Sequence, residues 1–115
     1  MSITLYHNPK CSKSRQTLEL LKQNGITPTI IEYLKTPPTA EALKAILVQL
    51  GFSPRDLMRK KEAVYAENEL DNPSLSDDDL IDFMIQNPIL IERPIVLANG
   101  KAALGRPPEQ VLDIL

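Results

Sequence analysis

The chain has 115 residues, of which 43% are hydrophobic, enough for one domain with a modest core. Its formal net charge is −2 with both signs interspersed, and no apolar run approaches the roughly 18 residues of a membrane-spanning helix, so we expect neither a nucleic-acid nor a membrane partner. A single cysteine excludes the disulfide-stabilised secreted class and is typical of a reducing compartment, so we expect a cytoplasmic protein.

The N-terminal part of the chain predicts a β-α-β unit. Residues 3–6 alternate as a short strand, and residues 11–23 place leucines on one helical face. Residues 29–33 are β-branched and aromatic, which predicts a second strand. This spacing predicts that the two strands are parallel. Ligands bind at the C-terminal ends of such strands, and Cys11 lies just beyond the C-terminal end of the first one.

The middle of the chain predicts a helical insertion over about residues 39–87. Apolar residues recur at helical spacing over 43–50, which predicts an amphipathic helix. A short helix is expected over 54–59, another over roughly 61–69, and a longer one after the N-cap Ser76.

The C-terminal part predicts a β-hairpin formed by residues 95–98 and 101–104, followed by a last helix. The complete order gives a small mixed β-sheet flanked by helices. This is an α/β, thioredoxin-like fold with a helical insertion, in one domain over residues 1–115. A proline that enters the third strand of such a sheet is commonly cis and faces the active cysteine, so Pro94 is a possible cis-proline.

Cys11 is the leading candidate for a nucleophile because it lies where a strand passes to a helix N-terminus. Unpaired N–H groups and the helix dipole there stabilise a thiolate, and they bring the thiol pKa below its free value of about 8.5. His7 would favour the thiolate when charged or accept a proton when neutral, although a structural hydrogen bond fits it equally well. Ser12 and Ser14 would donate to a thiolate or an anion, or only satisfy the helix N-terminus. The alternative for Cys11 is a small buried side chain.

Three arginines form a second group of candidates, because each lies at an element boundary: Arg59, Arg93 and Arg106. The planar guanidinium makes bidentate, charge-assisted hydrogen bonds to tetrahedral oxyanions. Singly, each arginine is typical of a solvated surface charge. Together, around a helix N-terminus, they would form an oxyanion site.

Motifs of several other functional classes are missing from the sequence. It contains no phosphate-binding P-loop, no dinucleotide glycine motif and no cluster of histidines and cysteines, so we expect no bound metal or cofactor. The acidic run at residues 77–79 predicts the first turn of a helix, since consecutive helical carboxylates point in different directions. Cys11 and Arg15 are also too close for a C-x5-R phosphatase loop.

The segment around Cys11, YHNPKCSKSRQTL, resembles the N-terminal signature of the glutaredoxin-coupled arsenate reductase family. Three later segments resemble that family too: LMRKKE, LIDFMIQNPILIERPIV and LGRPPEQVLDIL. The resemblance covers essentially the whole chain. A short, arsenate reductase-like branch of the family is closest to the segment IVLANGKAALGRPPE. Longer members of the family continue past the position of Leu115. It implies a thioredoxin-like fold with a helical insertion, and reduction of arsenate to arsenite with glutathione and glutaredoxin as electron donors.

Position by position, the resemblance implies that Cys11 is the nucleophile, that His7 lowers its pKa and that Ser14 hydrogen-bonds the thiolate. The arsenate oxygens would be bound by Arg59, Arg93 and Arg106. In the implied mechanism the thiolate attacks arsenic and displaces an oxygen. Glutathione, a co-substrate, then reduces the arsenic, and glutaredoxin regenerates the enzyme through a mixed disulfide. The single cysteine independently requires an external thiol for redox chemistry.

Two other functions remain open. Spx-like regulators, which contact RNA polymerase, share this fold, but they usually carry a C-x-x-C pair, whose second position is Ser14 here. A monothiol oxidoreductase acting on glutathionylated proteins would need Cys11 but not three oxyanion-binding arginines.

Overall fold

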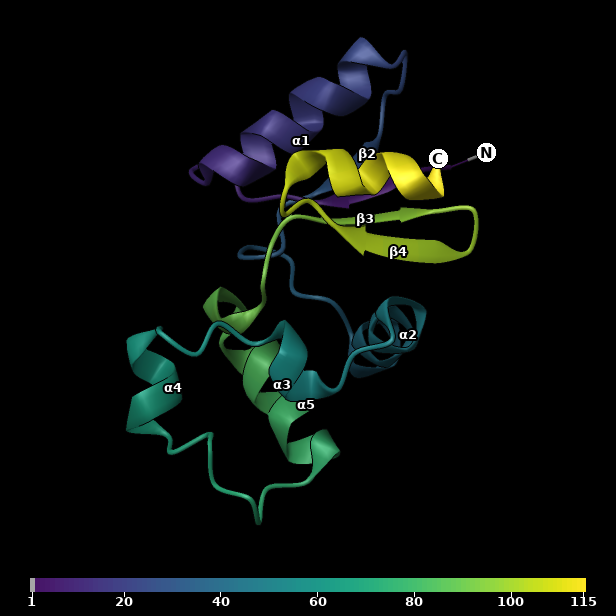
Figure 1. The fold of residues 1–115 in the computed structure, drawn as a ribbon. Coiled ribbons are helices and arrows are strands. Elements are labelled where there is room, and N and C mark those ends of the chain that lie inside the picture. Colours follow the sequence, from purple (N-terminus) through teal and green to yellow (C-terminus); the bar gives the residue numbers. More distant parts are fainter. Residues whose placement is uncertain (1) are drawn as a thin grey trace. The chain divides into compact units, whose positions relative to one another are not determined.

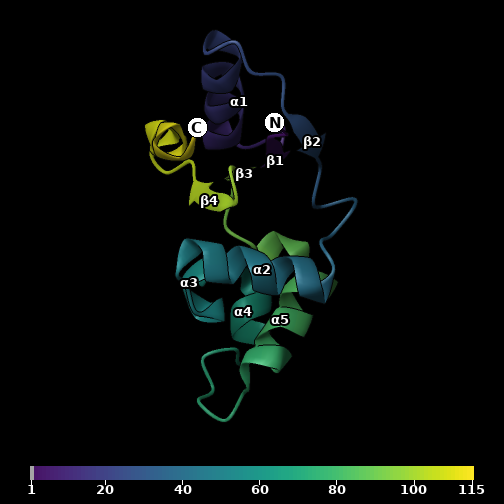
Figure 2. The ribbon, with the colours of Figure 1, turned by 90° about the vertical axis from the view of Figure 1, so that its right-hand side faces the viewer.

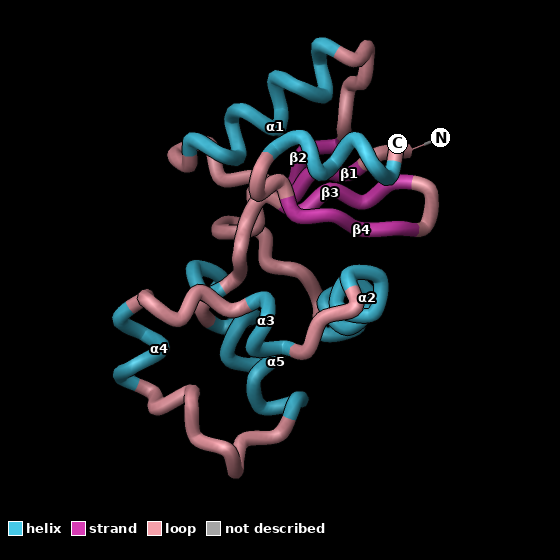
Figure 3. Tube along the Cα trace, viewed as in Figure 1, coloured by secondary structure: helices cyan, strands magenta, loops and turns pink. Residues whose placement is uncertain are grey.

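The computed structural model describes residues 2–115, which divide into two compact units (Figure 3). Unit 1 combines the two ends of the chain, up to Thr36 and from Arg93 onward, and holds all the described strands. Unit 2 is the segment Pro37–Glu92, which is helical and contains the expected insertion of about 39–87. The expectation that residues 1–115 form a single domain stays a prediction.

Unit 1 is built on a four-stranded mixed sheet in the order β2-β1-β3-β4 (Figure 1). The strands are β1 (Thr4–Tyr6), β2 (Thr29–Ile31), β3 (Ile95–Ala98) and β4 (Lys101–Leu104). Strand β1 pairs parallel with β2 and antiparallel with β3, and β3 pairs antiparallel with β4. The mixed sheet expected from the sequence is therefore confirmed.

Helix α1 (Ser12–Gln23) and the C-terminal helix η2 (Pro108–Ile114) lie on the same face of this sheet (Figure 2). Their core contacts explain the placement, because one buried cluster joins both helices to two strands: Leu5, Leu21, Val96 and Val111. Burying these aliphatic side chains contributes about 1.5–3 kcal/mol each. The last helix is a 3₁₀ helix rather than an ordinary α-helix, as its Gln110 N–H bond to the Pro107 carbonyl indicates.

Unit 2 contains four α-helices and a short 3₁₀ helix within the described residues: α2 (Ala40–Leu50), α3 (Pro54–Leu57), α4 (Ala63–Glu67), α5 (Asp77–Gln86) and η1 (Pro88–Leu90). The caps expected from sequence are present, since the Ser76 hydroxyl accepts from the Asp79 N–H at 3.1 Å in a reciprocal capping box. Across residues 2–115, no helix has the length and apolar character needed to cross a membrane.

The short helix expected over residues 54–59 is wrong at its end, because α3 stops at Leu57. Met58 is extended and forms an antiparallel bridge with Ile91. The Arg59 N–H donates to the Leu90 carbonyl at 2.7 Å, so this pairing takes the place of further helical hydrogen bonds. Arg59 therefore lies on a bridge rather than on a helix.

Candidate functional site

Cys11 occupies the N-cap position of α1, with extended backbone angles of φ −94° and ψ 125°, and its side chain is only 8% exposed. The loop before it is held by local hydrogen bonds. The Cys11 N–H donates to the Asn8 carbonyl at 3.0 Å, and Nη1 of Arg15 donates to the Pro9 carbonyl at 2.9 Å. These contacts fix the thiol at the start of the helix, as the sequence predicts.

The environment of Cys11 favours its thiolate. Burial by itself raises the pKa of the thiol, but the Ser14 N–H, the hydrogen bond and charge of Arg93, and the Lys13 N–H together lower it below its ordinary value. Two of these donors belong to the first turn of α1, where backbone N–H groups have no helical partner. The Cys11 thiol is therefore ionised at a lower pH than a free cysteine would be.

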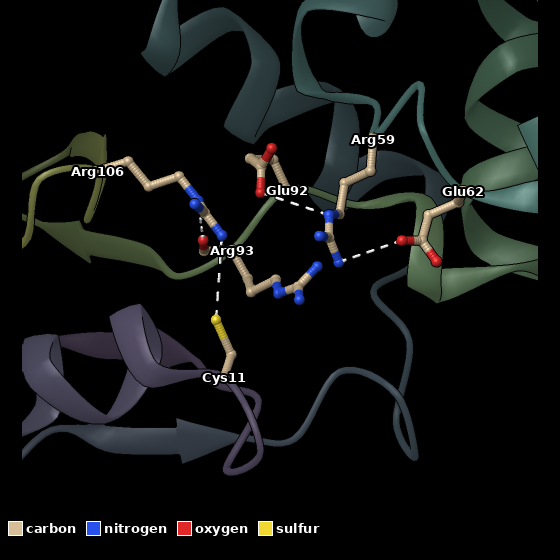
Figure 4. Close-up of polar contacts among 6 residues, drawn as sticks. All are labelled: Cys11, Arg59, Glu62, Glu92, Arg93 and Arg106. Atoms are coloured by element: carbon tan, nitrogen blue, oxygen red, sulfur yellow. Dashed lines mark hydrogen bonds and ion pairs between the residues drawn. The ribbon is translucent and has the colours of Figure 1, made fainter.

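Arg106 contacts the thiol of Cys11 and the backbone of Arg93 (Figure 4). Arg93 gives the same thiol a hydrogen bond and a positive charge. Nη2 of Arg106 lies 4.0 Å from the sulfur, and its Nε donates to the Arg93 carbonyl at 2.8 Å. The hairpin register explains this pairing, because Ile95 is opposite Leu104, so that Arg93 and Arg106 are opposed two residues further out. Both arginines precede prolines in cis peptide bonds, including the Arg93–Pro94 bond for which the topology suggested that form.

His7 and Ser14 form a buried pair behind the cysteine loop. Nδ1 of His7 lies 2.6 Å from Oγ of Ser14, and the same hydroxyl accepts from the Asn8 N–H at 3.0 Å. Burial lowers the pKa of His7, the Glu32 carboxylate opposes this, and the charge of Arg15 lowers it further. His7 is therefore neutral at pH 7, and the Ser14 hydroxyl joins it to the loop.

We expect Ser14→Ala to destabilise the fold by about 1–3 kcal/mol, because it leaves the buried Nδ1 of His7 and the Asn8 N–H without this partner. Urea denaturation of both proteins measures the difference. The neighbouring Ser12→Ala is the matched control, since Ser12 is exposed in the same helical turn. Equal losses in the two variants would contradict the assignment.

Arg59 belongs to unit 2, where its guanidinium is paired with two carboxylates (Figure 4). Nη1 lies 3.5 Å from Glu62 and Nε lies 3.7 Å from Glu92, and all three side chains are about one quarter exposed. The contacts in unit 1 thus join Cys11, Arg93 and Arg106, while the place of Arg59 in an oxyanion site stays a prediction.

Metal-binding clusters are not found among residues 2–115, where no group of three or more histidine, cysteine, aspartate or glutamate side chains is arranged to hold an ion. The acidic run at the start of α5 has a structural role instead. Asp79 accepts from the Ser76 N–H at 3.0 Å, which satisfies a donor at the helix N-terminus.

Comparison with known proteins identifies the family of this chain. A family model described as the ArsC family matches residues 6–114. The chain belongs to the ArsC family. It is 56% identical over 114 residues to the uncharacterized protein YfgD of Escherichia coli K12, covering 98% of this chain and 96% of that protein. It is 50% identical to an arsenate reductase of Neisseria meningitidis strain Z2491, with 98% and 97% covered.

A solved structure shares the fold as well. The arsenate reductase from Vibrio cholerae matches with a TM-score of 0.97 at 56% identity, covering 100% of this chain and 98% of that one. The family resemblance and the thioredoxin-like fold expected from the sequence are therefore confirmed.

Gly105 and Thr17 pack together beside Pro94, and sequence analysis missed both. Thr17 is fully buried on α1, and its hydroxyl donates to the Lys13 carbonyl at 2.9 Å. Gly105 donates its N–H to the Pro94 carbonyl at 3.0 Å. A Cβ on Gly105 would collide with Oγ1 of Thr17 and would lie 2.6 Å from Cγ of Pro94. Their sequence positions could have indicated both residues, since Gly105 adjoins Arg106 and Thr17 lies about two turns into the helix that begins after Cys11.

We expect Gly105→Ala to destabilise the fold by about 1–3 kcal/mol, because the added methyl group has no space beside Pro94. Gly100→Ala is the control. A substitution at Gly100 is strained by a φ of +72°, which Gly105 does not have, but nothing lies within 4 Å of the added Cβ, so the control measures backbone strain without a collision. Urea denaturation measures stability. The pH dependence of Cys11 alkylation should change only in Gly105→Ala, because Gly105 precedes Arg106 and its N–H bonds to the carbonyl of Pro94, which follows Arg93. A normal profile in that variant would show that Gly105 does not position the arginines.

Proposed function

We propose that this chain reduces arsenate to arsenite, with the thiolate of Cys11 as the attacking group. The observation that carries the proposal is the meeting of two arginines at a thiol of lowered pKa. A monothiol oxidoreductase would need the thiol but not the arginines. ArsC relatives named arsenate reductase, at 50% identity over nearly the whole chain, support the same substrate.

In the first step the Cys11 sulfur forms a bond to arsenic. The guanidinium groups of Arg93 and Arg106 hold arsenate oxygens by charge-assisted hydrogen bonds and stabilise the negative charge that builds up on them. One arsenate oxygen takes up a proton and leaves as water. The product is a covalent adduct in which arsenic is still As(V).

Reduction then needs two electrons from thiols outside the chain, since its sequence has one cysteine. We assign these thiols to glutathione and glutaredoxin. Glutathione forms a second sulfur–arsenic bond as another water leaves. The glutaredoxin thiolate attacks the glutathione sulfur, a mixed disulfide forms, and the electron pair of the broken bond stays on arsenic as As(III). Water then displaces the Cys11 thiolate and releases arsenite.

The remaining residues have supporting roles in this proposal. Arg59 is the third arginine that binds arsenate oxygens, and Glu62 and Glu92 hold its guanidinium within unit 2. Neutral His7 and Ser14 hold the loop before Cys11 against the first turn of α1, whose Lys13 and Ser14 N–H groups favour the thiolate. Glutathione acts as co-substrate without a resident cofactor, and the reaction takes place in the cytoplasm, where these thiols are kept reduced.

The decisive assay mixes the purified protein with arsenate, glutathione, glutaredoxin and an NADPH-coupled recycling system. We expect NADPH oxidation and arsenite formation that require every component, and no turnover with phosphate or sulfate in place of arsenate. Absence of arsenite under these conditions would overturn the proposal. Release of glutathione from a glutathionylated peptide would then favour the monothiol oxidoreductase, and recovery of the RNA polymerase α subunit in a pull-down would favour the Spx-like regulator.

A further inference from the structure

Thr17 is a polar residue at a position that an aliphatic side chain could fill. It is fully buried on α1, on the same helical face as Ser14 and Leu21. A buried hydroxyl gives up its hydrogen bonds to water, so it destabilises a fold unless the protein supplies a partner. Valine has nearly the same shape without that cost. The hydroxyl of Thr17 therefore points to a role beyond packing.

One peptide group links the hydroxyl of Thr17 to Cys11. The hydroxyl donates to the Lys13 carbonyl at 2.9 Å. That carbonyl belongs to the planar peptide unit whose N–H is that of Ser14. Burial raises the pKa of the Cys11 thiol, and the Ser14 N–H makes the largest of the contributions that lower it. A continuous series of donors and acceptors thus runs from the Thr17 hydroxyl through this peptide to the sulfur.

The bond from Thr17 strengthens the Ser14 N–H as a donor. A hydrogen bond to a carbonyl oxygen polarises the whole peptide, and such chains gain about 10–30% in strength per bond. The bond also fixes the orientation of a peptide in the first turn of α1, where the backbone N–H groups have no helical partner. Both effects favour the charged thiolate over the neutral thiol, because hydrogen bonds to an ionised acceptor are the stronger ones.

The hydroxyl of Thr17 is also shielded from water by the chain that carries Arg106. A Cβ on Gly105 would collide with Oγ1 of Thr17, so the backbone of Gly105 packs directly against this hydroxyl. Pro94 lies on the same side, since its carbonyl accepts the Gly105 N–H at 3.0 Å. In such a water-free setting the bond to the Lys13 carbonyl is stronger than it would be in solvent.

We propose that Thr17 is a positioning residue for the Cys11 thiolate: its hydroxyl holds and polarises the Lys13–Ser14 peptide, whose N–H favours the thiolate. Its part in catalysis rests on the proposed function, in which this thiolate attacks arsenic. Its effect on the thiolate itself is measurable without arsenate.

The first test compares two substitutions of Thr17 that remove different parts of its side chain. Thr17→Val removes the hydroxyl and keeps the branched shape. We expect the pH midpoint of iodoacetamide alkylation to rise, so that alkylation below the midpoint slows about twofold to fivefold while the plateau rate at high pH is retained. The sequence has one cysteine, so the reaction reports Cys11 alone.

Thr17→Ser is the matched variant, because it keeps the hydroxyl and loses the methyl group. It should be less stable toward urea than wild type and still have the wild-type midpoint. A purely structural role would give the opposite order, with the larger change in Thr17→Ser. An unchanged midpoint in Thr17→Val, or an equal rise in Thr17→Ser, would overturn the inference.

Amide chemical shifts separate an effect through the peptide from an effect through the arginines, since Arg93 and Arg106 also act on the thiol. In Thr17→Val, we expect the Ser14 amide proton to move upfield, the direction of a weaker hydrogen bond, and the Arg106 amide to stay in place. A shift of Arg106 without one of Ser14 would overturn the inference. Thr17→Ala, which also lacks the hydroxyl, serves in both measurements if the valine variant does not fold.

Arsenate turnover separates this inference from the proposed function. A raised midpoint in Thr17→Val, with no arsenate reduction by wild type, would retain the positioning role and reject the proposed function. If wild type reduces arsenate, kcat/KM below the midpoint should fall about twofold to fivefold in Thr17→Val and recover in Thr17→Ser. Equal turnover by wild type and Thr17→Val would reject the part of Thr17 in catalysis.

Discussion

Replacement of Cys11 by serine is expected to lower kcat/KM for arsenate by at least about 10³-fold. The hydroxyl of serine fits the space of the thiol, but it stays protonated at pH 7 and is a far weaker nucleophile. The three groups that favour the thiolate, the Ser14 N–H, Arg93 and the Lys13 N–H, remain in place in this variant. The measurement is steady-state arsenate reduction by both proteins with glutathione and glutaredoxin at fixed concentrations.

The same variant has a stability signature, which follows from the lowered pKa of Cys11. Between that pKa and the unfolded value of about 8.5, the unfolded chain binds more protons than the folded one, so stability rises with pH. Wild type should therefore gain stability relative to Cys11→Ser as pH rises through this window, and should lose that gain as pH falls below the folded pKa. Urea denaturation at several pH values measures it. A difference that does not vary with pH would contradict a stabilised thiolate.

Short-range chemistry explains which elements could be predicted from the sequence. The Asn99-Gly100 turn has φ values of 55° and 72°, as a two-residue hairpin turn requires, and these residues adopt such angles readily. The α5 start is equally local, because Ser76 and Asp79 satisfy each other's backbone donors. The end of α3 was not predictable in this way. It depends on the bridge between Met58 and Ile91, which are distant in sequence.

The site shows the same division. The position of Cys11 at a helix N-terminus could be predicted from its neighbours. Its contact with Arg106, which is 95 residues away in the sequence, depends on the register of the β3–β4 hairpin. That register was available in principle, since the two-residue turn that pairs Ile95 with Leu104 also opposes Arg93 and Arg106. The burial of Ser14 and Thr17 on α1 could not be predicted, because a hydropathy pattern assigns polar side chains to the exposed face of a helix.

Removing the side chain of Arg93 is expected to have the second-largest effect. In Arg93→Ala, kcat/KM for arsenate should fall by about 10²–10³-fold, the cost of removing one group that stabilises an oxyanion. The pKa of Cys11 should rise as well, because Arg93 supplies both a hydrogen bond and a positive charge to the thiolate. Arg93 is a cleaner probe than Arg106, whose Nε also holds the Arg93 carbonyl at 2.8 Å.

Arg93→Lys separates the two contributions of this arginine. Lysine keeps the positive charge but cannot make the planar, bidentate contact that guanidinium offers to an oxyanion. We therefore expect Arg93→Lys to keep most of the lowered Cys11 pKa, measured from the pH dependence of iodoacetamide alkylation, while kcat/KM for arsenate still falls steeply. If the lysine variant has full activity, the positive charge alone is sufficient and the bidentate hydrogen bonds of the Arg93 guanidinium are not needed. If the alanine variant reduces arsenate at the wild-type rate, the oxyanion site lies elsewhere, although the thiol chemistry of Cys11 would stand.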